Sequence, residues 1–252
     1  MRMENIKKLI AQNFSKAAIQ YEQEAILQKM CAERLAQIIK NYQAIIVPGA
    51  GAEIGCGTGF LTKQLLTLFP SKPMDITDLS VQMVEQCKSN YCHSNLSFSV
   101  QDGENYPQKA YAFIASNLAF QWFSRFKESF SKLQDSLKRE GILFFSTLVE
   151  GSFAEWKNIC QAYHLPYTAN PLPKVEDLES IYPEGVFEIQ TYSLFYPSAL
   201  HFFRHLQNIG ASTSVGKQLA PLTLKQLIKA WNHESPSEIT VSYRVVFGVI
   251  KV

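Results

Sequence analysis

The chain has 252 residues, of which 46% are hydrophobic and 18% are charged, and its formal net charge is +2 at pH 7. This length suits one sizeable α/β domain, or two small ones, with a substantial core. The small net charge argues against nucleic-acid binding, which usually needs a concentrated basic face, and no apolar run reaches the roughly eighteen residues of a membrane span. Residues 1–20 lack the apolar stretch of a secretory signal, so we expect a soluble, cytoplasmic protein with no nucleic-acid or membrane partner.

Five cysteines are scattered along the chain, at positions 31, 56, 87, 92 and 160. An odd, scattered set in a chain of ordinary size argues against a disulfide framework. The segment 87–93, CKSNYCH, lacks C-x-x-C spacing and no second pair follows it, so we expect reduced structural thiols. Cys56 has no adjacent base to activate it and is expected to be a small apolar filler.

The first predicted elements are helices. Residues 16–40 contain no Gly or Pro, and Ser15 is available as the N-cap of a helix there. The apolar side chains that form its stripe are Ile19, Ile26, Leu27, Met30, Leu35, Ile38 and Ile39. A shorter amphipathic segment precedes it around 6–10. Residues 44–55 then indicate a buried strand, interrupted at 48–51, and a helix follows the glycine-rich turn.

Strands and helices alternate through the next hundred residues. The expected strands cover 74–80, 96–103, 111–120 and 142–149. Ser80 caps one intervening helix, and another is predicted by the spacing of Phe126, Phe130, Leu133 and Leu137, with Gly141 at its C′ position. This alternation predicts a parallel, doubly wound sheet.

The pattern changes after residue 150. We expect helices at 152–163, 198–211 and 222–232, strands at 186–196 and 238–252, and a proline-rich irregular stretch at 164–185. The whole chain, 1–252, is predicted to be one domain. Its expected parts are an N-terminal helical lid (1–42), a cofactor-binding core (43–150), a substrate cap and insert (151–238) and a final strand (239–252).

The stretch AEIGCGTGF, residues 52–60, places Gly55, Gly57 and Gly59 between a strand and a helix. In an open parallel sheet this turn lies where the strand order reverses, which is where ligands bind. Glycine lets backbone approach a ligand because a Cβ would collide with it. A dinucleotide fingerprint has its third glycine where this chain has Phe60, which disfavours a nicotinamide cofactor.

Two aspartates follow neighbouring strands. Asp78 lies about twenty residues past the turn, where a carboxylate accepts both hydroxyls of a ribose; the start of a helix also favours a carboxylate there. Asp102 ends the next strand, where it suits the exocyclic amine of a purine, although a solvated turn aspartate before Gly103 explains it nearly as well.

The segments EIGCGTG, DLS followed by Met83, and QDGENYP resemble, in that order, the motifs of class I S-adenosylmethionine-dependent methyltransferases. The resemblance implies an α/β, doubly wound, Rossmann-like class I methyltransferase sheet with N-terminal helices and a helical cap inserted before the last strand. It also implies S-adenosylmethionine as the cofactor, with Glu53 and Gly55 beside the methionine moiety, Asp78 at the ribose and Asp102 at the adenine. The full set of implied cofactor residues is Glu53, Gly55, Gly57, Gly59, Asp78, Leu79, Met83, Asp102, Gly103 and Asn117.

Three further stretches, 14–28, 116–123 and 203–212, resemble the malonyl-acyl carrier protein O-methyltransferases of biotin synthesis. The resemblance implies methylation of the free carboxylate of malonyl-acyl carrier protein, or of malonyl-coenzyme A, to a methyl ester. A carboxylate with an unperturbed pKa of about 4 is already ionised at neutral pH, so we expect catalysis by in-line placement and desolvation. The residues expected at the acceptor are Tyr21, Arg204, Asn117, Gln121 and Trp122.

Arg204 is the first choice for orienting the carboxylate, because a planar guanidinium matches a carboxylate at two points. A solvated helix face would also explain Arg204, and Arg125 and Arg244 are weaker candidates. His201 and His205 have a spacing that could bind zinc on one helix face, but they lack the glutamate of H-E-x-x-H and a third nearby ligand. We therefore expect no metal.

Three lysines, Lys217, Lys225 and Lys229, would attract an acidic carrier protein, although a solvated helix face explains them equally well. Two alternative functions remain open. One is methylation of another small carboxylate, such as an aconitate-like acid, which would be indifferent to a carrier. The other is a catalytically silent S-adenosylmethionine-binding partner subunit, which would not depend on Tyr21 and Arg204.

Overall fold

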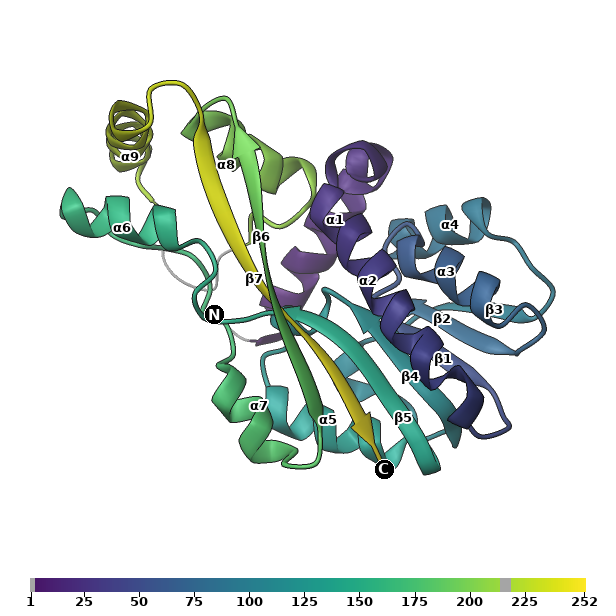
Figure 1. Ribbon diagram of the computed structural model, residues 1–252. Coiled ribbons are helices and arrows are strands. Elements are labelled where there is room, and N and C mark those ends of the chain that lie inside the picture. The colour runs from purple at the N-terminus through teal and green to yellow at the C-terminus, as the bar shows by residue number, and fades with distance from the viewer. Residues whose placement is uncertain (1–2, 214–218) are drawn as a thin grey trace.

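A computed structural model describes residues 3–213 and 219–252. Within those residues a seven-stranded mixed sheet forms the centre, in the order β3-β2-β1-β4-β5-β7-β6 (Figure 1). The five parallel strands are β1 (Gly51–Ile54), β2 (Met74–Asp78), β3 (Leu96–Val100), β4 (Tyr111–Asn117) and β5 (Leu137–Leu148). The last two, β6 (Val186–Tyr196) and β7 (Ile239–Lys251), run antiparallel to their neighbours. The predicted doubly wound α/β fold is confirmed, with the reversal of strand order between β1 and β4.

Helices cover both faces of the sheet because its strands are apolar on both sides. On β5, Phe144 belongs to one core and its neighbours Leu143 and Phe145 belong to the other, since successive strand residues point to opposite faces. The first core lies under α2 (Ile26–Tyr42), α3 (Phe60–Leu68) and α4 (Val81–Asn90). The second lies under α5 (Phe126–Asp135) and α7 (Val175–Ile181).

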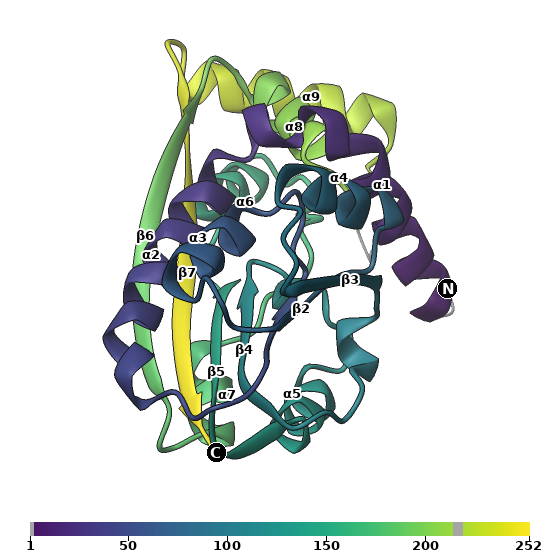
Figure 2. The same ribbon diagram turned by 90° about the vertical axis from the view of Figure 1, so that its right-hand side faces the viewer.

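The remaining helices gather beyond the carboxyl ends of the parallel strands (Figures 1 and 2). They are α1 (Met3–Glu24), α6 (Ala154–Ala162), α8 (Ala199–Asn208) and α9 (Pro221–Glu234). Three short 3-10 turns complete the described elements: η1 (Gln43–Ile45), η2 (Gly103–Asn105) and η3 (Phe120–Trp122). Helices from both the N-terminal and the C-terminal parts of the chain therefore cover the edge of the sheet where ligands are expected.

The single helix predicted at 16–40 is two helices that meet at Ala25. Ser15 is not an N-cap: it lies inside α1, and its hydroxyl hydrogen-bonds the Ser80 hydroxyl at 2.8 Å. The predicted stripe is also not continuous, since Ile19 is 89% exposed and Ile26 is 55% exposed. The helices bury separate faces, α1 packing against α4 and α8 and α2 against α3.

Three further boundaries were wrong. The strand expected at 44–55, with an interruption at 48–51, is strand only after the interruption, in the short β1; the residues before it form a 3-10 turn and an irregular segment. Gly141 is not a helix C′ residue, since α5 ends at Asp135 and Gly141 lies within β5. The stretch predicted to be irregular contains α7, in which Val175 and Leu178 are buried three residues apart.

Candidate functional site

The three glycines of the turn after β1 have different surroundings. Gly55, Gly57 and Gly59 have φ angles of 72°, 53° and 106°, where a side chain costs conformational energy. A Cβ on Gly55 would lie 2.4 Å from the Ala119 Cβ, and one on Gly59 would lie 2.5 Å from the Tyr91 ring. A Cβ on Gly57 would meet nothing nearer than a Tyr21 ring carbon at 3.6 Å. Of the three, only Gly57 has open space where a Cβ would lie; at Gly55 and Gly59 that space is occupied by the side chains of Ala119 and Tyr91.

Asp78 is held at the end of β2 as a hydrogen-bond acceptor. Its Oδ2 accepts from the Gly57 backbone N–H at 3.0 Å, and its Oδ1 accepts from the Ser80 N–H at 2.8 Å. Burial raises the pKa of Asp78, and these backbone donors oppose that increase. The carboxylate is therefore fixed beside the glycine turn, where its remaining lone pairs suit hydroxyl donors.

The end of β3 carries two acidic side chains that α1 covers. Lys7 Nζ donates to Asp102 Oδ2 at 2.7 Å and forms an ion pair with Glu104. Burial acts to raise the pKa of Glu104, but the Lys7 ammonium and the Arg125 backbone N–H hold it below its usual range. Lys7 thus joins α1 to the strand edge, a contact that sequence analysis did not anticipate.

Glu53 lies behind the glycine turn. It is 1% exposed, its Oε2 accepts from the Thr62 hydroxyl at 2.6 Å, and its Oε1 has no hydrogen-bond partner among the described residues. Burial raises the pKa of Glu53 well above its usual range, which favours the protonated form.

A narrow cavity of about 90 Å³ lies where these parts meet. The residues predicted for the cofactor that line it are Gly55, Gly57, Asp78, Leu79, Met83, Asp102, Gly103 and Asn117. Glu53 and Gly59 do not line it, because one points behind the turn and the other packs on Tyr91. Lys7 and Ile10 of α1 also line it; the amphipathic character of 6–10 was their only sequence signal.

The lining of the narrow cavity has the chemistry that the cofactor implied by the sequence motifs needs. Asp78 offers a fixed acceptor for ribose hydroxyls, and the bare Gly57 leaves backbone open to the cavity. The apolar side chains of Leu79 and Phe123 line the same space, as a purine ring requires.

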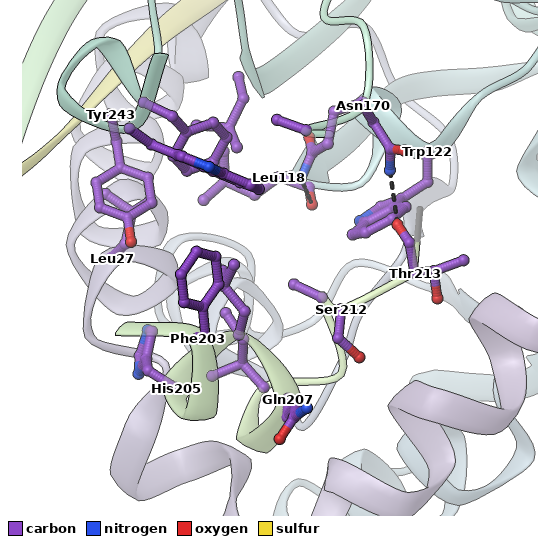
Figure 3. A pocket seen from close by; sticks show the side chains of 18 of the residues that line it. Leu27, Leu118, Trp122, Asn170, Phe203, His205, Gln207, Ser212, Thr213 and Tyr243 are labelled. Atoms are coloured by element: carbon purple, nitrogen blue, oxygen red, sulfur yellow. Dashed lines mark hydrogen bonds between the residues drawn. The ribbon is translucent and has the colours of Figure 1, made fainter. Parts of the chain in front are cut away.

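A wider cavity of about 350 Å³ adjoins the narrow one (Figure 3). It is lined by α1 and α2, by the segment after β4, by residues between 153 and 224, and by Leu148 of β5 and Tyr243 of β7. Phe14, Tyr21, Leu118 and Trp122 line both cavities, so the two meet at these side chains. Apart from Tyr21, Gln121 and Trp122, which were expected at the acceptor, its polar lining comprises Gln28, Thr168, Asn170, His205, Gln207, Ser212, Thr213 and Tyr243.

The segment after β4 is braced by hydrogen bonds to its polar side chains. Asn117 Nδ2 donates to the Gln28 carbonyl at 2.9 Å, and Gln121 Nε2 donates to the Leu118 carbonyl at 2.6 Å. Leu118 has a φ of 49°, which is strained for a residue with a side chain. Gln121 and Trp122 line the wide cavity, whereas Asn117 lines the narrow one.

Tyr21 and Arg204, both expected at the acceptor, have different surroundings. Tyr21 is 8% exposed and stacks on Phe60 with ring centroids 6.1 Å apart, and burial, with a contribution from Asp78, raises the pKa of its phenol. Arg204 is exposed on α8 and lies outside the described lining of both cavities. Its neighbours Phe203 and His205 line the wide cavity, because successive helix residues point in different directions.

The other arginines and the candidate metal ligands lie in separate places. Arg125 is exposed, and Arg244 Nη1 donates to the Glu150 carbonyl at 3.2 Å. His201 bonds Ser198 at 2.8 Å and His205 bonds Glu24 at 3.2 Å. The described residues contain no group of three or more His, Cys, Asp or Glu side chains placed to hold a metal ion. Among them, too, no helix combines the length and apolar character needed to cross a membrane.

Comparisons with known proteins agree with this geometry. A methyltransferase domain family matches residues 52–141. The malonyl-[acyl-carrier protein] O-methyltransferase of Magnetococcus marinus is 29% identical, over 95% of this chain and 90% of the relative. The malonyl-[acyl-carrier protein] O-methyltransferase 2 of Ilyobacter polytropus is 31% identical, over 83% of this chain and 82% of the relative.

Solved structures show the same fold at lower identity. The YcgJ protein of Bacillus subtilis superimposes with a TM-score of 0.59 at 13% identity, covering 86% of this chain and 97% of that one. A putative methyltransferase of Bacillus halodurans superimposes with a TM-score of 0.58 at 12% identity, covering 87% of this chain and 97% of that one. These likenesses establish the architecture of the sheet and its helices.

Proposed function

This chain belongs to the class I S-adenosylmethionine-dependent methyltransferases, and we propose that it methylates the free carboxylate of malonyl-acyl carrier protein to a methyl ester, an early step of biotin synthesis. The observation that carries the proposal is similarity along most of the chain to relatives named for that reaction. The similarity extends beyond the matched core at 52–141 into the lid and cap, which supply the wide cavity. Malonyl-coenzyme A is the smaller substrate with the same reacting group.

The reaction needs placement more than proton transfer. When bound, S-adenosylmethionine supplies a methyl group that its sulfonium charge activates. The acceptor carboxylate is already ionised at neutral pH, so the protein's task is to remove water from one oxygen and to hold it in line. Tyr21 and Trp122 line both cavities and therefore lie where the acceptor would meet the cofactor.

The division of the chain follows from this role. We propose that residues 1–42 act as a helical lid, 43–150 as the cofactor-binding core and 151–238 as the substrate cap and insert, with 239–252 as the final strand of the single domain 1–252. Glu53, Gly59 and Arg204 lie outside both linings, so any part they play would be indirect. For the carrier, exposed Lys225 and Lys229 on α9 offer positive charge near the cap, while Lys217 lies outside the described residues.

Methyl transfer from labelled S-adenosylmethionine tests the proposal. Malonyl-acyl carrier protein, malonyl-coenzyme A and free malonate are compared as acceptors, and the product is treated with base. A base-labile methyl ester that forms fastest on the carrier-bound substrate is the expected result. Faster transfer to a free acid, including an aconitate-like acid, would indicate a different carboxylate substrate. Cofactor binding without transfer to any acceptor would indicate a silent partner subunit.

A further inference from the structure

Only one side chain in the described lining of the wide cavity can carry a positive charge. Among the described residues that line this cavity, His205 is the only one that can carry a positive charge, and none carries a carboxylate. The wall also presents Gln28 Oε1, which is buried with no hydrogen-bond partner in the described part of the chain. A cavity with these features is suited to a polar ligand and offers an anion a single cationic partner.

Glu24, the last residue of α1, holds the His205 ring in place. His205 Nδ1 lies 3.2 Å from Glu24 Oε2, and Asn208 Nδ2 donates to Glu24 Oε1 at 3.3 Å. An ionised carboxylate only accepts hydrogen bonds, so Nδ1 carries the hydrogen and donates it. The His205 ring also packs on Tyr196, with centroids 5.2 Å apart. His205 Nε2 is left as the nitrogen that can meet a ligand, since no described residue hydrogen-bonds it.

The same contact brings His205 close to the junction of the two cavities. Tyr21, which lines both cavities, lies three residues before Glu24 on α1. Residues three apart on a helix are neighbours on its surface, with Cβ atoms about 5–6 Å apart. A group that bonds Glu24 therefore lies within about one helical turn of the Tyr21 position. In Figure 3, Phe203, His205 and Gln207 of α8 lie on one side of the pocket and Trp122 lies on the other.

We propose that His205, oriented by Glu24, binds the acceptor's free carboxylate through Nε2–H in its protonated form. The inference rests on the proposed function and moves the carboxylate contact from Arg204 to the adjacent residue. One carboxylate oxygen is then held by His205 while the other remains available for methylation. Glu24 is a positioning residue: its Oε2 holds His205 Nδ1, and its Oε1 accepts from Asn208 Nδ2, so the ring is fixed relative to α1.

The experiment measures ligand binding to the complex with S-adenosylhomocysteine by calorimetry. The ligands are the malonyl thioester of N-acetylcysteamine and the isosteric carboxamide, which lacks the charge. The variants are His205→Gln, Glu24→Gln, Arg204→Gln and, as the matched control one helical turn away, His201→Gln. Methyl transfer to the malonyl thioester is measured in parallel, and the wild-type protein must show it.

We expect His205→Gln to weaken binding of the carboxylate ligand about tenfold or more and to leave the carboxamide within about twofold, because only the charged ligand loses an ion pair. KM should rise by the same factor as the carboxylate affinity falls. The ratio of carboxylate affinity to carboxamide affinity should therefore fall in His205→Gln. It should fall less in Glu24→Gln and should stay the same in His201→Gln.

Equal weakening of both ligands in His205→Gln would show a packing role and overturn the inference, as would a larger change of the ratio in Arg204→Gln. Either result leaves the proposed function standing if the wild type transfers methyl groups. A wild type that methylates no malonyl thioester overturns the proposed function, and the assignment of His205 falls with it.

Discussion

The narrow and wide cavities meet at four side chains, yet they are built in different ways. The narrow cavity is made mainly by consecutive segments at the ends of β1, β2, β3 and β4, and α1 closes one side of it. The wide cavity is made mostly by side chains from residues 14–28 and 153–224, two regions that are separated by more than a hundred residues in the chain. The narrow cavity therefore depends mainly on the strand edge, whereas the wide cavity depends on how distant segments of the chain pack together.

The largest expected effect is the loss of cofactor affinity when Asp78, which lines only the narrow cavity, is replaced. Asp78→Ala should lower cofactor affinity by at least about 100-fold, because two hydrogen bonds to a charged acceptor are worth about 3 kcal/mol together. Calorimetry with S-adenosylhomocysteine measures the effect. Asp75→Asn is the matched control on the same strand, since its carboxylate bonds Lys109 and Tyr111 instead of lining the cavity. Unchanged affinity in Asp78→Ala would refute the ribose assignment.

The glycine turn offers a test of fold against ligand binding. Gly59→Ala should destabilise the protein by about 3 kcal/mol or more, because its φ of 106° and the Tyr91 ring at 2.5 Å both exclude a Cβ. Gly57→Ala should cost only about 1 kcal/mol in stability but should weaken cofactor binding, since its Cβ enters the cavity. Denaturant unfolding without ligand, followed by calorimetry, measures both quantities. Equal stability losses in the two variants would contradict the division of tasks.

The difference in construction also explains what the sequence could reveal. That Asp78 and Asp102 share one cavity could be predicted because each lies at the end of a predicted strand, and the ends of parallel strands share one edge. Glu53 and Gly59 belong to the same motif but face the protein interior, a distinction that spacing does not encode. The break at Ala25 carries no Gly or Pro and depends on what each helix packs against. Lys7 and His205 reach their sites only through tertiary contacts with Asp102 and Glu24.

Glu104 and Glu53, which lie at and beside the narrow cavity, should contribute to folding stability with opposite dependence on pH. The pKa of Glu104 is lowered in the folded state, so its contribution to stability is present above its unfolded pKa, about 4.3, and is lost as pH falls through the folded value. The pKa of Glu53 is raised, so its contribution is present below the unfolded pKa and is lost as pH rises.

Denaturant unfolding of Glu104→Gln and Glu53→Gln from pH 7 downward measures this contrast. The gap in unfolding free energy between wild type and Glu104→Gln should narrow on acidification, whereas the gap between wild type and Glu53→Gln should widen in favour of the wild type. Parallel pH dependence in the two variants would mean that the Lys7 contact does not set the charge state of Glu104.

The smallest expected effect is on the rate with the carrier-bound substrate, and it tests whether the exposed lysines of α9 attract the carrier. Lys225 and Lys229 lie one turn apart and exposed on α9, so Lys225→Glu with Lys229→Glu should lower kcat/KM for malonyl-acyl carrier protein about fivefold at low salt. The loss should shrink as salt is added, since exposed charges are screened. The malonyl thioester of N-acetylcysteamine, which has no carrier, should be turned over as before. Lys63→Glu with Lys88→Glu makes the same change in net charge on α3 and α4; an equal loss there would show that total charge, and not the α9 surface, attracts the carrier.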